Sequence, residues 1–305
     1  MFASLFLLAA AQISIPLGKP RIIEQPRAPI EKSGPLWASQ CKDFDDWDKA
    51  GPPVRIHGNT YYVGTCGISA ILVTGSDGHI LIDSGTEAGA EIVARNIARL
   101  GFNLGDVRYI LASHDHFDHV GGLSALQQRS KASVLASSRA APVLATGRAD
   151  KDDPQAGMHK PMATVSVDSP PLRDGQRVRL GNVLVEAIAT PGHTPGAMSY
   201  RWISCDGGVC RTIVYADSLT AVSRDDYRFS DHPEYLKAFR DSIARVAASE
   251  CEILVTPHPS SSKLRDRFAR GEPLLDTDGC KTYAAALTKQ LDGRLAKEAA
   301  AKKAR

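Results

Sequence analysis

Short apolar runs and helix-spaced apolar residues alternate along most of the chain. Apolar runs of strand length, bounded by turn residues, predict β-strands. They occupy residues 54–63, 69–74, 79–82, 109–112 and 133–135 in the first half, and 176–180, 183–189, 197–203, 212–216 and 252–256 in the second. Apolar residues at helical spacing predict helices that include residues 87–100, 233–248 and 280–297. The order predicts an α/β protein in which two β-sheets pack face to face with helices outside.

The region before the first strand lacks this periodicity. Residues 12–36 are rich in proline and predict an extended N-terminal arm. Residues 37–47 predict a short helix with Trp37, Phe44 and Trp47 as packing residues. No linker interrupts the rest of the chain, so residues 37–305 are expected to form a single domain. Within it, the polar stretch 147–160 is a candidate loop over a functional site.

Composition places the chain among ordinary globular proteins. Its 305 residues are 43% hydrophobic and 23% charged, which is ample for a sizeable core. The formal net charge of +3 is small, so we expect neither nucleic acid nor an acidic membrane surface as a partner. No apolar run approaches the roughly 18 residues that a membrane span needs.

The first residues form a separate apolar segment. Residues 1–11 end in small residues and resemble the apolar core and cleavage region of a secretory signal, with a cut expected after Ala11. The segment lacks the usual Lys or Arg at its start, and a buried first strand is the alternative. The cysteines favour export, and we expect the periplasm of a bacterium.

Six cysteines support this expectation. An even number together with an export signal favours disulfides, whereas six reduced thiols in a cytosolic enzyme are the alternative. Cysteines that are neighbours in sequence suggest three bonds, although other pairings remain possible. The suggested pairs are Cys41–Cys66, Cys205–Cys210 and Cys251–Cys280.

Three histidines and two aspartates fall within residues 114–119, directly after a buried-strand pattern. Imidazole and carboxylate are ligands suited to zinc and similar cations. If the chain is still extended at His114 and His116, their side chains project to the same side. Asp118 and His119 then lie past the strand end and can serve a second position. Because α/β folds place sites at such strand ends, the cluster predicts a metal site with ligands for two neighbouring metals.

Other residues can complete or support this site. His193 lies between two Pro-Gly turns at a strand end, and His258 lies between two prolines, so each is a candidate single ligand. Asp115 should point away from the metals, toward a hydrogen bond behind a ligand. Asp83 ends a neighbouring strand, where it can orient a ligand histidine or cap the next helix. The remaining histidines are expected on the surface or in structural positions: His57, His79, His159 and His232.

Four motifs together carry a family resemblance. His-x-His-x-Asp-His, Thr-Pro-Gly-His, Ala-Asp-Ser-Leu and Thr-Pro-His-Pro-Ser resemble the metallo-β-lactamase superfamily, from about Val54 to the C-terminal helix. The resemblance implies that superfamily's fold, a four-layer αββα sandwich of two mixed β-sheets with helices outside. It does not select one reaction, because glyoxalase II-type thioesterases, lactonases, ribonucleases and sulfatases share these motifs.

Three features resemble β-lactamases of subclass B3. His119 follows Asp118, Ser218 stands where another main subclass carries a metal-binding cysteine, and the closing segments resemble that subclass, including its Cys251–Cys280 bond. One feature leaves a thioesterase or lactonase open. Asp217 lies where the thioesterases carry a carboxylate that bridges both metals.

The resemblance implies a ligand set and a reaction. The first zinc would take His114, His116 and His193, and the second would take Asp118, His119 and His258. A zinc-bound hydroxide would then open the β-lactam ring of penicillins, cephalosporins and carbapenems, with Asp118 also orienting the hydroxide. The metal is expected to be zinc rather than manganese or iron, the partner a small-molecule substrate, and the enzyme a monomer.

Two hydroxyl groups near the predicted metal site are candidates for binding the substrate. Ser218 and Thr220 are expected to bind the substrate carboxylate, because hydroxyls at that strand end would point into the groove. The alternative for both is the capping of a turn or helix.

Overall fold

The computed structural model describes residues 12–13, 33–271 and 274–303. They contain two six-stranded sheets, and both are mixed. In the first sheet the strands β2 to β5 are antiparallel, and β5, β6 and β7 are parallel. Its strands follow chain order: β2 Val54–His57, β3 Thr60–Tyr62, β4 Ile71–Gly75, β5 Gly78–Ile82, β6 Val107–Leu111 and β7 Ser133–Leu135.

The second sheet combines an antiparallel centre with parallel edges. The strands β8 to β11 are antiparallel, while β1 pairs in parallel with β8 and β12 in parallel with β11. The order is β1 Gln12–Ile13, β8 Arg177–Leu180, β9 Val183–Ala189, β10 Met198–Asp206, β11 Val209–Tyr215 and β12 Ile253–Val255.

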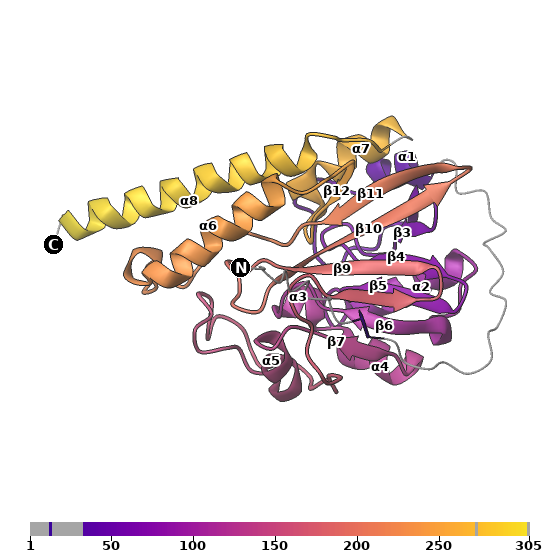
Figure 1. Cartoon of the computed structure of the whole chain (residues 1–305), viewed down its shortest axis with the longest axis horizontal. Coiled ribbons are helices and arrows are strands. Elements are labelled where there is room, and N and C mark those ends of the chain that lie inside the picture. Colours follow the sequence, from indigo (N-terminus) through magenta and orange to yellow (C-terminus); the bar gives the residue numbers. More distant parts are fainter. Residues whose placement is uncertain (1–11, 14–32, 272–273, 304–305) are drawn as a thin grey trace, which may run out of the picture.

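Helices cover the outer face of each sheet. One apolar cluster joins the first sheet to the helices on its outer face, another does the same for the second sheet, and a third fills the space between the sheets. In Figure 1, α6 and α8 lie side by side along one side of the molecule, opposite α4 and α5. The predicted αββα sandwich is confirmed. The covering helices are α2 Gly89–Arg99, α4 Leu123–Ser130, α5 Ala140–Thr146, α6 Pro233–Ala247 and α8 Gly279–Lys303.

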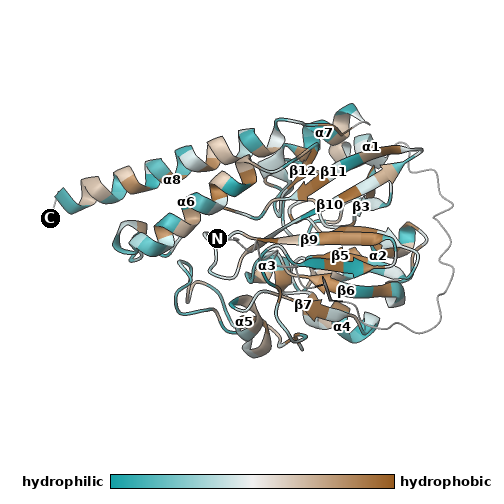
Figure 2. Cartoon of the chain, in the orientation of Figure 1, coloured by the Kyte–Doolittle hydropathy of each residue, from teal (hydrophilic) through white to brown (hydrophobic). Residues whose placement is uncertain are grey.

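Burial along the strands follows their place in the sandwich. Every residue of β5 is buried, because this central strand is covered on both faces. In β9 buried and half-buried residues alternate, so its deeper face meets the other sheet. Figure 2 shows the strands mostly brown and the helices in alternating colours, as expected for amphipathic helices on apolar sheets.

The bounds predicted for the first helix, residues 37–47, are wrong. Helix α1 spans Ser33–Gln40 instead, so the last residues of the predicted arm are helical. Trp37 is buried as expected, in edge-to-face contact with Tyr62 and Phe268. Phe44 is 90% exposed, so its predicted packing role is wrong. The remainder of the predicted arm, and the expected signal at residues 1–11, lie outside the described residues apart from β1.

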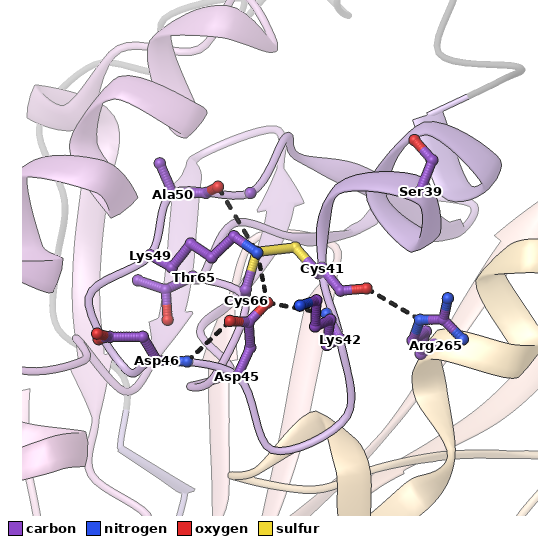
Figure 3. Close-up of a disulfide and its surroundings, with 12 residues drawn as sticks. Ser39, Cys41, Lys42, Asp45, Asp46, Lys49, Ala50, Thr65, Cys66 and Arg265 are labelled. Atoms are coloured by element: carbon purple, nitrogen blue, oxygen red, sulfur yellow. Dashed lines mark hydrogen bonds and ion pairs between the residues drawn. A yellow bond between two sulfur atoms is a disulfide. The ribbon is translucent and has the colours of Figure 1, made fainter.

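Local hydrogen bonds explain why this helix stops. Asp45 accepts a hydrogen bond from the backbone N–H of Lys42, and Asp46 accepts one from that of Asp48. Aspartate side chains that bind nearby backbone groups favour turns over helix. Cys41 is bonded to Cys66, and Arg265 donates to the Cys41 carbonyl (Figure 3). These contacts fix the segment that follows α1.

The three disulfides match the predicted pairs. Cys41–Cys66 ties the end of α1 to the loop after β3. Cys205–Cys210 crosses the hairpin between β10 and β11. Cys251–Cys280 joins the start of β12 to the start of α8. No helix among the described residues is long and apolar enough to cross a membrane.

Candidate metal centre

The carboxyl ends of strands from both sheets meet at one edge of the sandwich. The segment after β6 carries residues 113–119, and His193, Asp217 and His258 follow β9, β11 and β12. At this edge a buried aspartate, Asp83, accepts hydrogen bonds from the Ser113 backbone N–H and hydroxyl at 2.7 and 2.6 Å.

Asp83 also accepts a hydrogen bond from the Tyr215 hydroxyl at 2.6 Å, so it links the two sheets. Burial raises the pKa of Asp83 to about 6. Its nearest oxygen lies 3.9 Å from His119 Nδ1, beyond hydrogen-bond range. Of the two predicted roles, the structure shows neither a bond to a ligand histidine nor a helix cap. Asp83 instead fixes the point at which the chain leaves β6.

Three buried histidines form the first cluster: His114, His116 and His193, whose ligand atoms lie within 4.8 Å of one another. In each ring one nitrogen makes a close hydrogen bond to a protein oxygen. His114 Nδ1 lies 2.7 Å from Asp217 Oδ1, and His193 Nδ1 lies 3.0 Å from both the carbonyl and the hydroxyl of Thr220.

The other ring nitrogens fit a metal. Among the described residues His114 Nε2 is buried without any hydrogen-bond partner, although buried polar atoms are nearly always paired. A cation held by this nitrogen and those of the two neighbouring histidines would satisfy it. Hydrogen bonds to the far nitrogen of a ligand histidine are the usual support of such a site. The donor atoms of the first cluster, and the groups that hydrogen-bond to its rings, therefore fit a metal site.

A second cluster lies beside the first. Asp118 Oδ2 is 3.0 Å from His119 Nε2 and 3.4 Å from His258 Nε2, and the two histidine nitrogens are 3.3 Å apart. His114, Asp118 and His119 also form a group that can hold a metal ion. Trp47 flanks this cluster, with its ring 5.9 Å from that of His258.

Burial and neighbouring charges keep four of these donors in the protonation state that binds a metal. Burial and the neighbouring imidazoles hold the pKa of His114 and of His193 well below the ordinary value. Burial, helped by His119, lowers the pKa of His258 to about 4. Burial acts to raise the pKa of Asp118, but His119 outweighs it and the pKa lies well below its usual range. Neutral imidazole and ionised carboxylate are the ligand forms, so little proton release is needed at these positions.

Asp217 and Asp115 lie behind the first cluster. Asp217 is fully buried and binds His114 on the ring side away from the free Nε2. It belongs to neither metal-binding group, and in this structure its carboxylate supports a ligand histidine. Asp115 is also buried outside both groups, and burial raises its pKa to about 6. Its predicted place away from the metals agrees with this position.

The two hydroxyls expected to bind substrate differ in their contacts. Thr220 directs its hydroxyl to His193 Nδ1, so it neither caps a helix nor stands free. Ser218 is buried directly after Asp217. Their roles toward a substrate carboxylate stay predictions.

Sequence reasoning missed several residues at this centre. Asp153 Oδ2 lies 3.0 Å from His116 Nε2, and the Gln155 amide lies 3.4 Å from His193 Nε2. Both belong to the loop that was expected over the site, but neither stood in a recognisable pattern. Trp47 was expected only as a packing residue. Its ring instead lies 5.6 Å from that of Phe117, beside the second cluster.

Comparisons with known proteins agree with this geometry. The model of the metallo-beta-lactamase superfamily matches residues 63–258. The solved structure of the MIM-2 metallo-beta-lactamase is 50% identical, with a TM-score of 0.82 over 90% of this chain and 100% of that chain. MEM-A1, a subclass B3 metallo-beta-lactamase from a soil metagenome library, is 42% identical, with a TM-score of 0.81 over 84% of this chain and 99% of that chain.

Curated relatives match over a shorter stretch. A hydroxyacylglutathione hydrolase of Bradyrhizobium sp. (strain ORS 278) is 28% identical over 130 residues, which are 40% of this chain. The chain spans 42% of the length of that relative. Because the family model covers more than half of the chain, and solved members align over nearly their whole length, the chain belongs to the metallo-β-lactamase superfamily and is most like its subclass B3.

Proposed function

We propose that this protein is a zinc-dependent β-lactamase of subclass B3 that hydrolyses penicillins, cephalosporins and carbapenems. The observation that carries the proposal is the position of Asp217. Its carboxylate binds His114 Nδ1 and lies outside both metal-binding groups. A thioesterase of this superfamily would be expected to use this carboxylate as a bridge between the metals. The nearly complete alignment with MIM-2 and MEM-A1 supports the same assignment.

The proposal assigns two Zn²⁺ to the two clusters. His114, His116 and His193 would hold the first, and Asp118, His119 and His258 the second. Three protein ligands for each ion leave positions open for water and substrate, as catalytic zinc requires. Zinc bound there would supply a Lewis acid for the β-lactam carbonyl and a nucleophile derived from water near neutral pH.

The chain's own groups would position the reactants. The Asp118 carboxylate would accept a hydrogen bond from the attacking water and orient it toward the carbonyl carbon. The hydroxyls of Ser218 and Thr220 would bind the substrate carboxylate. Trp47 and Phe117, which contact each other beside the second cluster, would exclude water from that side of the groove.

The proposal also covers where the protein is located and whether it is a monomer. The three disulfides fit an exported protein. We propose that residues 1–11 direct export to the periplasm, that residues 37–305 act as one hydrolase domain, and that the enzyme is a monomer. The core shared by both sheets supports the single domain.

The test offers zinc-loaded protein a carbapenem, a penicillin and a glutathione thioester, each with and without a chelator. We expect loss of the β-lactam absorbance, its abolition by the chelator, and its recovery on adding zinc. His258→Ala should lose most activity, whereas His57→Ala should retain it, since His57 instead bonds the Val209 carbonyl. Thioester turnover with intact β-lactams would contradict the proposal, and would favour the activity named for the curated hydroxyacylglutathione hydrolases.

A further inference from the structure

One carboxylate of the loop at residues 147–160 reaches the metal centre. Asp153 is 1% exposed, although its neighbours Lys151 and Asp152 are exposed. Asp153 Oδ2 lies 3.0 Å from His116 Nε2. Its other oxygen, Oδ1, accepts a hydrogen bond from the backbone N–H of Gln155 at 2.7 Å. Both oxygens are therefore engaged, and the carboxylate has a defined direction.

The backbone at Asp153 is held from another segment. Arg224 donates from its guanidinium to the Asp153 carbonyl at 3.2 Å, and its backbone N–H donates to the Pro154 carbonyl at 3.0 Å. The Arg224 guanidinium also lies over the ring of Tyr227, 5.3 Å from its centroid. Asp153 is thus fixed by its main chain as well as by its side chain, which a group that orients a ligand requires.

The contact with Asp153 decides which His116 nitrogen is available to a metal. A neutral imidazole carries one proton, and a carboxylate acceptor places that proton on the nitrogen it faces. Asp153 faces Nε2, so Nδ1 keeps the lone pair. His114 has the same arrangement with its two nitrogens exchanged, because Asp217 faces Nδ1 and leaves Nε2 free.

We infer that Asp153 is a positioning residue of the metal centre, which holds His116 with its Nε2 protonated and its Nδ1 directed to the metal. This inference rests on the proposal that His116 binds a metal. It gives the loop a role in holding the metal in addition to its place in the lining of the cavity beside His116 and Phe117. The same loop offers a matched comparison, because the exposed Asp152 pairs with Arg139 and has no contact with a ligand histidine.

The decisive variant is Asp153→Asn, with Asp152→Asn as its control. An asparagine has one oxygen and one NH₂ group, so it cannot accept from both Gln155 and His116. If the oxygen stays on the Gln155 N–H, the NH₂ group donates to His116 Nε2 and drives the proton to Nδ1. Loss of such a partner typically weakens metal binding about 10–100-fold. Competition with a chromophoric chelator should show this loss for one of the two zinc ions, and a change within about twofold for Asp152→Asn.

A spectroscopic measurement on the unaltered protein makes the test independent of how the variant folds. Imidazole ¹⁵N shifts of the zinc-loaded full chain, assigned by comparison with His116→Gln, should show Nε2 of His116 protonated. A protonated Nδ1 would overturn the inference, as would an Asp153→Asn protein that binds both zinc ions as tightly as the wild type. If the wild type itself binds no zinc, the proposed function fails together with this inference. Normal β-lactam turnover with unchanged zinc affinity in the variant removes only the role of Asp153.

Discussion

Each histidine of the first cluster is bound at one nitrogen by a group from a different part of the chain. Asp217 binds His114, Asp153 binds His116, and Thr220 binds His193. These partners set which nitrogen of each ring carries its proton. These contacts orient the three rings so that their ligand atoms lie within 4.8 Å of one another.

Thr220 offers a test of the substrate-binding role at this scale. We expect Thr220→Val to keep zinc affinity within a few fold, because the Thr220 carbonyl still accepts from His193 Nδ1. If the hydroxyl also binds the substrate carboxylate, its loss should raise KM by about tenfold, the equivalent of one charge-assisted hydrogen bond. Steady-state kinetics with a penicillin measure this, and Thr220→Ser serves as the control. An unchanged KM would limit Thr220 to supporting His193.

The sequence allowed the candidate ligands to be predicted but not the groups that hydrogen-bond to them. His114, His116, Asp118 and His119 lie in one dense cluster, which is a strong local signal. Asp153 lies far along the chain in a polar loop, and only the folded structure brings it to His116. Supporting groups of this kind have no fixed spacing from the residue they support.

At the scale of elements, helix α8 holds the segment that carries Ser218 and Thr220. Glu298 accepts hydrogen bonds from the backbone N–H groups of Phe229 and Ser230 at 3.1 and 2.9 Å, at the start of a short 3₁₀ turn. Arg294 donates to the Glu298 carboxylate and to the Tyr227 carbonyl. The late turns of α8 thus anchor the end of this segment.

Substituting Glu298 should destabilise the fold in a pH-dependent way. Burial acts to raise the pKa of Glu298, but the hydrogen bonds from Ser230 and Arg294 outweigh it, and the pKa lies below its ordinary value. A lowered pKa in the folded state stabilises the protein above the unfolded value of about 4.3, and this contribution disappears as the pH falls through the folded value. We expect Glu298→Gln to cost about 1–2 kcal/mol at pH 7 and much less near pH 3.

Urea unfolding of the zinc-free protein at both pH values measures this difference without interference from metal loss. The exposed Glu250 provides the matched control, because Glu250→Gln should change stability little at either pH. A Glu298→Gln cost that is equal at the two pH values would contradict the role of the charge.

The disulfides should contribute unequally. Cys251 and Cys280 are 29 residues apart, whereas Cys205 and Cys210 are five apart within one hairpin. In the chain-entropy model the longer loop stabilises by about 3–4 kcal/mol and the shorter by about 2 kcal/mol. Thermal unfolding of the two double serine variants should therefore show the larger loss for Cys251→Ser/Cys280→Ser. Equal losses would mean that loop closure does not govern these bonds.

Sequence patterns located these elements better than they located their ends. Most predicted strands and the long helices were found because apolar spacing reflects which face is buried, but the strand predicted at residues 54–63 is a hairpin of β2 and β3. The helix after residue 32 was misplaced because it ends at Gln40. There the carboxylates of Asp45 and Asp46 accept hydrogen bonds from nearby backbone N–H groups, and Cys41 forms a disulfide. Such local competition does not alter the apolar pattern, so the pattern does not reveal it.

At the scale of the whole molecule, the metal centre joins the two sheets. The first cluster takes two histidines from the segment after β6 and one from the segment after β9. Asp83 links Ser113 to Tyr215 across the same boundary. The fold class was predictable because the two halves repeat the same alternation of strands and helices. The sequence places each candidate ligand at the end of a strand, but only the folded structure shows that these strand ends meet at one edge of the sandwich.

The proposed export can be tested with the full chain expressed in a bacterium. We expect the protein in the periplasmic fraction with Gln12 as its first residue, because the apolar segment ends in small residues at Ala11. N-terminal sequencing and a thiol assay of the purified protein measure processing and disulfide formation. Leu8→Glu, which interrupts the apolar segment, should leave the precursor unprocessed. Full-length cytoplasmic protein with free thiols would contradict the proposal.

The loop at residues 147–160 divides into a buried part and an exposed part. Asp153, Pro154 and Gln155 are buried beside the metal centre, while residues 157–160 are exposed near Phe117, whose ring lies 4.6 Å from that of His159. Under antibiotic selection these two parts would evolve at different rates. Substitutions at 157–160 can reshape the entrance to the groove without loss of metal, so new substrate preferences should arise there, while 153–155 should resist change. Substitutions that confer resistance to a new drug would then accumulate at the exposed residues 157–160.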